Sequence, residues 1–436
     1  MDLRYSKKAP AACTLFALLG FPVFSAYASD VSPYLFGDWD GERTRLANEG
    51  IGFDFGYTGE AAHNVSGGKK QLTRYADQWA FGTRLDLDKL WGWKGSSFEV
   101  VITERNGRNL TADAGLGNYQ QVQEVYGRGQ TWHLTVFAFD QQFFDDKLEW
   151  RAGRLPVGSD FATFSCEFQN LTFCGSQPGN IVGDYWINWP VSQWATWLKW
   201  STTDQTYVKL GAYQLNPRYV DDTWARANGW KLSFPGGTRG ALVPLEFGWT
   251  PTLHGLPGSY RFGGWYNNVG GANLYYDVNR EPMALTGEAP LQDRSRHGGY
   301  VTLQQQVTGT AGGSGLNLFF NATFADSRTS PVDRQIALGA IYSGPFQHAN
   351  DRIGVAVGTT HGSDHLARYE RLYNEVHPDS PIPVEDRGEF AVEVFYDWRP
   401  MPWLSLRPNV QYMVYPGGST ENSNTLVLGL KSSMAF

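Results

Sequence analysis

The sequence is short of charged residues and of long apolar runs. Charged side chains make up 18% of the 436 residues, below the ~25% that is usual for soluble domains. Mean hydropathy is −0.38, and beyond residue 28 no apolar run reaches the ~18 residues of a membrane-spanning helix. The chain also has no internal repeat of about 40–50 residues, which argues against a propeller. These absences exclude a helical membrane protein.

Catalytic and metal-binding signatures are also missing. The sequence contains no G-x-S-x-G motif, and neither His133 nor His254 has a serine partner at a predictable spacing. His361 and His365 are four residues apart but fall in a predicted loop, so we expect no metal site and no cofactor there. The net charge of −7 disfavours nucleic acid as a partner. We therefore do not expect an enzyme or a nucleic-acid-binding protein.

The chain has three cysteines, and the first of them lies in a predicted export signal. Three cations precede an apolar stretch over residues 11–24 and an A-x-A motif at residues 26–28, which predicts a signal peptide over residues 1–28. In an exported chain, the close pair Cys166 and Cys174 predicts a disulfide. Two free thiols are the alternative, and two ligands alone do not make a zinc site.

Apolar and polar residues alternate, with a period of two residues, in many stretches of the sequence. The last stretch, residues 424–436, places Leu426, Leu428, Leu430 and Met434 on one face and mostly small or polar residues on the other. This pattern predicts a strand with one apolar and one wet face. Its final aromatic, Phe436, is what we expect of the closing strand of an outer-membrane barrel.

Residues 51–436 contain about sixteen strand candidates of this kind, and most are near the ~9–11 residues that cross a bilayer. Their connections alternate between short turns and long loops, which is the pattern of an outer-membrane barrel. We therefore predict an all-β fold, a transmembrane antiparallel β-barrel with short periplasmic turns and long extracellular loops. Residues 29–50 are expected to form a periplasmic segment with a short helix. A soluble sandwich is the alternative, but it leaves the loop asymmetry unexplained.

A barrel of this size encloses an aqueous channel, so its constriction decides what passes. The longest loop, residues 156–192, carries the cysteine pair, and we expect it to fold inward and narrow the pore. Arginines and carboxylates together can hydrogen-bond a neutral polyol, and indole faces can stack on a sugar ring. The residues predicted to line the constriction on these grounds are Arg105, Asp140, Glu149, Arg151, Arg154, Trp186 and Trp189. The alternative for the charged residues is that they are solvated or form ion pairs along the wall, with no role in binding a solute.

Long motifs also resemble a known family. FGDWDGERTRLANEGIGFDFGYTGEAAHNVSGG, FFDDKLEWRAGRLPVGSDF and NWPVSQWATWLKW are similar to the carbohydrate-selective porins of the OprB type, and the similarity runs from about residue 34 to residue 436. The family opening usually has a second glycine where Asp40 stands.

The resemblance implies passive diffusion of glucose and other small carbohydrates across the bacterial outer membrane, with surrounding lipid as the other partner. A general or anion-selective porin without a sugar-specific site is the alternative. The sequence leaves open whether barrels associate as homo-oligomers.

Overall fold

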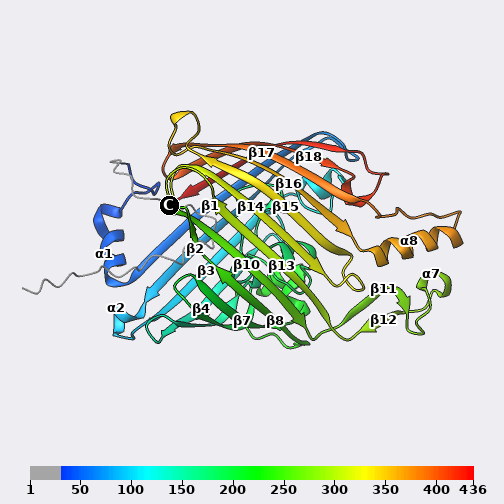
Figure 1. Cartoon of the computed structure of the whole chain (residues 1–436), viewed down its shortest axis with the longest axis horizontal. Helices are drawn as coiled ribbons and strands as arrows, with labels where there is room; N and C mark the ends of the chain where they lie inside the picture. Colours follow the sequence, from blue (N-terminus) through cyan, green and yellow to red (C-terminus); the bar gives the residue numbers. More distant parts are fainter. Residues whose placement is uncertain (1–30) are drawn as a thin grey trace, which may run out of the picture.

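The computed structural model describes residues 31–436, so the predicted signal peptide and its cleavage site lie outside the described residues. Strands form one large antiparallel sheet that closes on itself when β1 pairs with β19 (Figure 1). The sheet counts seventeen strands, of which β9 (Thr252–Leu253) is a two-residue turn element. The other sixteen build the wall, which confirms the predicted barrel.

Each wall strand pairs with its neighbours in the sequence. Their bounds are β1 Ile51–Ser66, β2 Thr73–Asp86, β3 Ser96–Gly107, β4 Trp132–Phe143, β5 Leu148–Leu155, β6 Gln193–Ser201, β7 Thr206–Leu215, β8 Gly240–Trp249, β10 Leu256–Asn267, β13 Arg296–Gln306, β14 Gly315–Ala325, β15 Val332–Ser343, β16 Arg352–Gly362, β17 Gly388–Met401, β18 Leu404–Val414 and β19 Thr425–Ala435.

The predicted alternation decides which side chains face outward. In β17, Phe390, Val392 and Val394 are exposed on the outer wall, whereas Glu393 and Asp397 are buried inside. A closed barrel satisfies every ladder hydrogen bond and leaves no open sheet edge in the membrane. Among residues 31–436, no helix is long and apolar enough to cross a membrane.

The short-turn end carries α1 (Glu42–Glu49) and α2 (Leu87–Trp91) (Figure 1). Helix α1 ends at Gly50, whose φ of 103° suits glycine. Its Arg43 donates to the carbonyl oxygens of Phe436 and Phe53 at 2.6 and 2.8 Å. The helix is therefore attached at the seam between the first and last strands.

The long-loop end projects farthest where three elements pack together: α8 (Asp364–Val376), α7 (Met283–Thr286) and the hairpin of β11 (Gly271–Asp277) with β12 (Pro290–Asp293) (Figure 1). The remaining helices lie in loops: α3 Leu110–Asp113, α4 Val157–Asp160, α5 Gln177–Ile181 and α6 Asp222–Asn228. Short 3-10 turns are η1 Trp39–Gly41, η2 Leu171–Phe173, η3 Pro217–Val220, η4 Pro345–Gln347 and η5 Pro416–Gly418.

Two loops fold into the barrel, residues 108–131 and 156–192. Phe168 of the second loop is fully buried against Phe319 and Phe395 of the wall, with ring centroids 5.9 and 4.9 Å apart. Burial of one such ring stabilises the fold by roughly 1.5–3 kcal/mol. The lumen beside β14–β19 is thus filled by a packed core rather than by water. A pocket lies on the other side, beside β1–β5.

Candidate functional site

The loop over residues 156–192 is anchored to the far wall by a buried cluster of charges. Glu167 accepts a two-pronged hydrogen bond from Arg352 at 2.9 and 2.6 Å, and Arg407 lies 3.4 Å from the same carboxylate. Asp397, fully buried, accepts from Arg352 and Arg399 at 2.8 and 3.0 Å. Bidentate pairing of this kind fixes the position of the loop as well as its charge.

Backbone groups next to Glu167 extend the anchor. The amides of Gln169 and Asn170 both donate to Glu393 of β17, at 2.8 and 2.7 Å. The Asn170 side chain donates to Gln411 of β18 at 3.0 Å. The tip of the loop therefore bonds to two adjacent wall strands, which confirms that the loop folds inward.

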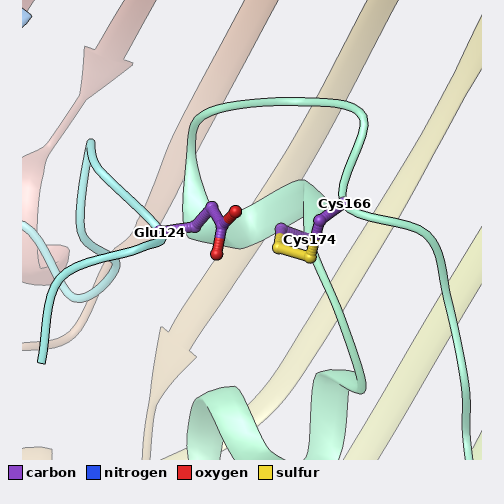
Figure 2. Close-up of side chains that lie close together, drawn as sticks. All are labelled: Glu124, Cys166 and Cys174. Carbon is purple, nitrogen blue, oxygen red and sulfur yellow. A yellow bond between two sulfur atoms is a disulfide. The ribbon is translucent and has the colours of Figure 1, made fainter. Parts of the chain in front are cut away.

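The predicted disulfide joins Cys166 and Cys174, which are eight positions apart and close the tip of the loop into a ring (Figure 2). Glu124 of the other inward loop lies beside the two sulfur atoms. This trio is not a metal site, because the sulfurs are bonded to each other and the Glu124 carboxylate pairs with Lys431 at 2.8 Å. The disulfide instead stiffens the segment that carries the anchor.

A pocket remains open in the lumen between this loop and the wall formed by β1–β5. Side chains that can bind a polar solute contribute much of its lining: Asp54, Arg84, Glu99, Arg151, Asp160 and Trp189. Gly52 and Gly82 complete the wall on this side. Because they carry no side chain, the wall leaves room for a solute at this level.

Arg151 organises the charges of the pocket. Its guanidinium donates to Glu99 on β3, two strands away. A second guanidinium nitrogen lies 3.5 Å from Asp140 on β4, the strand between them. Arg84 stands opposite Glu99 in the β2–β3 register, yet its hydrogen bond goes to the Ser97 hydroxyl at 3.2 Å. Arg84 therefore lines the pocket without a carboxylate partner within ion-pair distance in residues 31–436.

Trp189 supplies the aromatic face of the pocket. It is half-buried, and its indole N–H donates to Gln78 Oε1 at 2.9 Å. Arg105 Nε donates to the same oxygen at 2.9 Å. Arg105 is buried and does not line the pocket, but it fixes the residue that orients Trp189.

Asp160 approaches from the loop side, at the end of α4. Its carboxylate accepts from the Tyr213 hydroxyl at 2.7 Å, and its carbonyl accepts from Lys209 at 2.7 Å. Nearer the short-turn end, Glu149 pairs with Lys199 at 3.4 Å. The lumen side of β5–β7 is thus a chain of alternating charges that leads away from the pocket.

Five of the seven residues predicted to line the constriction do not line this pocket. Arg105, Asp140 and Glu149 form the hydrogen bonds and ion pairs given above, and the other two are Trp186 and Arg154. Trp186 is 0% exposed and makes edge-to-face contacts with Trp265 and Tyr300, so no solute reaches its ring. Arg154 pairs in register with Trp194 and belongs to the opposite face of β5 from Arg151. Its guanidinium is buried among loop carbonyls and lies over Tyr219. Both are structural residues, because packing and hydrogen bonds use the groups that a solute would need.

The pocket also contains four residues that the sequence analysis did not select: Asp54, Arg84, Glu99 and Asp160. Alternation along the strands could have predicted three of these residues. Asp54, for example, lies on the predicted inward register of the first strand. The signal that could have found Arg84 and Glu99 is the same alternation, since both lie on inward registers of adjacent strands and face each other in the β2–β3 ladder. Asp160 lies in an irregular loop, where no periodicity applies.

Comparison with known proteins places this geometry in a family. The sequence profile of the carbohydrate-selective porins of the OprB family matches residues 70–436. Porin B of Pseudomonas aeruginosa is 42% identical over 455 aligned residues, covering 99% of each chain. This chain is a member of the OprB family.

Two further proteins are also similar to this chain. The high-pH structure of Pseudomonas putida OprB is 42% identical and superposes with a TM-score of 0.89, covering 94% of this chain and 100% of that one. The putative porin QuiX of Acinetobacter baylyi is 32% identical over 92% of this chain and 93% of its own.

Family membership makes the protein an outer-membrane channel. The wall is that of an outer-membrane barrel, whose short turns face the periplasm and whose long loops face outward. The pocket beside β1–β5 accordingly lies along the route of a permeating solute.

Proposed function

We propose that this porin lets glucose and other small neutral carbohydrates diffuse passively across the outer membrane, and that they bind transiently in the pocket beside Arg151 and Trp189. The observation that carries this proposal is the combination of donors, acceptors and one aromatic face around a single opening. Sugar hydroxyls both donate and accept, so they match a lining that mixes both kinds of group.

The residues divide the task by chemistry. Arg84 and Arg151 offer fixed N–H donors, whereas Asp54 and Glu99 offer acceptors. Trp189 offers an apolar face for the C–H side of a pyranose ring. A pore for ions of one sign would instead carry a ring of one charge. Since the solute must also leave, its affinity is expected to be weak, on the order of millimolar, or about −4 kcal/mol.

The wall of the channel supports the rest of the assignment. One chain closes the whole barrel, so a single copy is sufficient for one pore. The outer band of exposed apolar side chains gives the surrounding lipid its contact surface. No part of this mechanism requires a chemical step, and we assign the protein no enzymatic role.

Liposome swelling tests the proposal directly. Glucose should enter proteoliposomes several-fold faster than a neutral amino acid of similar size, and glucose should reduce single-channel conductance in planar bilayers. Trp189→Ala should weaken that block several-fold. Trp200→Ala is the matched control, since Trp200 is exposed on the outer wall.

Equal swelling rates for both solutes would reduce the protein to a general porin. Strong ion selectivity that glucose leaves unchanged would favour an anion-selective pore.

A further inference from the structure

The outer wall of the barrel carries a hollow over β4–β7 that the transport function does not use. Its floor is built from small side chains that share one row of the sheet: Ala152, Thr196 and Ala212. Phe137 and Trp194 are among the aromatic residues that border it.

Strand register shows that the floor faces lipid rather than the lumen. Ala152 is the neighbour of Arg151, which points inward, and side chains alternate along a strand. The one polar group of the floor, the Thr196 hydroxyl, accepts from Trp150 Nε1 at 2.8 Å and donates to the Arg151 carbonyl at 3.1 Å. Because both hydrogen bonds of this hydroxyl are made within the protein, the floor offers a ligand only apolar contacts.

An extracellular segment overhangs the hollow. Residues 229–234 follow α6 and are held to the wall by three hydrogen bonds. The Leu134 amide donates to the Gly229 carbonyl at 2.9 Å, and the Ser233 carbonyl accepts from the Trp194 indole N–H at 2.9 Å and from Arg154 Nη1 at 3.5 Å. Phe234 contacts Trp194, with ring centroids 6.0 Å apart, and lines the hollow from above.

The same segment presents apolar side chains outward at every second position. Trp230, Leu232 and Phe234 are 56%, 51% and 72% exposed. Exposure of three large apolar side chains in six residues is costly in water but favourable at the membrane interface, where Trp is enriched. The segment therefore sits at the level where the acyl chains of the outer leaflet meet their headgroups.

The loop that bears this segment, residues 216–240, contains four cations and two carboxylates, Asp221 and Asp222. None of Arg218, Arg226, Lys231 and Arg239 forms an ion pair with a carboxylate among residues 31–436. Exposed cations near a membrane surface attract anionic headgroups. Of these cations, Lys231 belongs to the overhanging segment itself, so a positive charge without a carboxylate partner in residues 31–436 lies on the segment that borders the apolar hollow.

We propose that the hollow binds one acyl chain of an outer-leaflet lipid whose phosphate contacts the cations of the loop over residues 216–240. A second barrel fits the hollow less well, because the overhanging residues 229–234 stand out from the wall and would keep another flat sheet away. A single flexible chain can pass beneath the overhang. The bound lipid would hold the loop against the outer mouth of the pore.

Native mass spectrometry of the full-length mature protein, delipidated and then incubated with dipalmitoyl phosphatidylglycerol, tests this site. Wild type is expected to retain one lipid at low collision energy, and Ala212→Phe, which fills the hollow, should lower that occupancy at least fivefold. Ala340→Phe is the control, because Ala340 lies on the lipid-facing register of β15 between Leu318 and Val355. It should retain the lipid as wild type does.

A second variant, Ala152→Leu, covers the case in which Ala212→Phe fails to fold, as judged by heat-modifiable gel mobility. Lys231→Gln combined with Arg226→Gln should lower retention of the lipid several-fold without filling the hollow. Equal occupancy in wild type and in the folded hollow-filling variants would overturn the proposal. A dimer that Ala212→Phe dissociates, with lipid retention unchanged, would also overturn it and assign the hollow to a second copy.

Discussion

Neutralising Glu167 is the sharpest perturbation of the constriction that the structure offers. This residue is the loop's only carboxylate in the anchor, and the wall contributes Arg352, Arg407 and Asp397. Glu167→Gln keeps the size of the side chain and one hydrogen-bond acceptor. It leaves the three arginines of the cluster, including Arg399, with Asp397 as their one carboxylate partner within residues 31–436.

The size of the effect follows from the burial of this pair. Breaking a buried ion pair by removing one partner costs about 3–5 kcal/mol, and we take the lower end because the amide retains one hydrogen bond. A change of about 3 kcal/mol alters the ratio of anchored to detached loop roughly a hundredfold. The amides of Gln169 and Asn170 still hold Glu393, so we expect brief excursions of the loop rather than its permanent release.

Single-channel recording in planar bilayers detects such excursions. Glu167→Gln should show larger open-pore current noise and short steps to higher conductance, together with weaker block by glucose. Glu375→Gln is the control, because Glu375 is exposed on α8 far from the anchor. Noise and glucose block equal to those of wild type, in a variant that still migrates as a folded barrel, would refute the idea that this cluster holds the constriction.

Three further outcomes follow from the same geometry. Replacing Cys166 and Cys174 with serine opens the ring at the loop tip, so open-pore noise should rise without loss of the barrel; unchanged noise would show that the anchor alone suffices. Gly52→Leu places a side chain in the pocket, and its Cβ meets only Arg84 O at 3.8 Å, so glucose flux should fall several-fold while folding is kept; undiminished flux would mean that the route runs elsewhere. Burial raises the pKa of Glu370 in α8 to about 7, which means that the folded protein favours the protonated, neutral carboxyl group. The stability that this group contributes is therefore present at low pH and is lost as pH rises from about 4.5 through 7. Hydrogen exchange in α8, corrected for intrinsic rates, should therefore be faster at pH 8 than at pH 6, and Glu370→Gln should flatten that dependence.

The sequence predicted the wall well because a membrane imposes one simple rule on it. In β18, Val410 and Tyr412 face outward while Asn409 and Gln411 are buried within, as alternation requires. A strand in a closed barrel has few other options, since every polar group of its backbone must be paired. Periodicity therefore carries nearly all the information about these segments.

The site was harder to predict, because inward loops obey no period. Trp186 and Trp189 are three residues apart, yet the first is fully buried and the second lines the pocket. Nothing in their spacing distinguishes them, since the difference arises from packing against Trp265 of a distant strand. Arg154 is a different case. Alternation from Arg151 already places it on the outer face, so that error lay in the interpretation and not in the signal.

The inward fold of the second loop, residues 108–131, depends on contacts with distant parts of the chain. It is held by Glu60, fully buried on β1, which accepts from the Val125 amide at 3.2 Å and lies 3.2 Å from Lys431. The two partners of the Glu60 carboxylate, Val125 and Lys431, are at least 65 residues away. No local pattern reveals pairing over such a separation.

The two halves of the lumen meet different physical demands. A diffusive pore must keep one opening of constant shape while water surrounds its loops, and surface ion pairs exposed to water are too weak for that. Here the charges that hold the loop, such as Glu167 and Asp397, are buried on the side of β16–β18. Those that can meet a solute, such as Arg84 and Asp54, line the opposite side. Substitutions on β16–β18 should therefore change selectivity only through the position of the loop, whereas those on β1–β3 should change it without moving the loop.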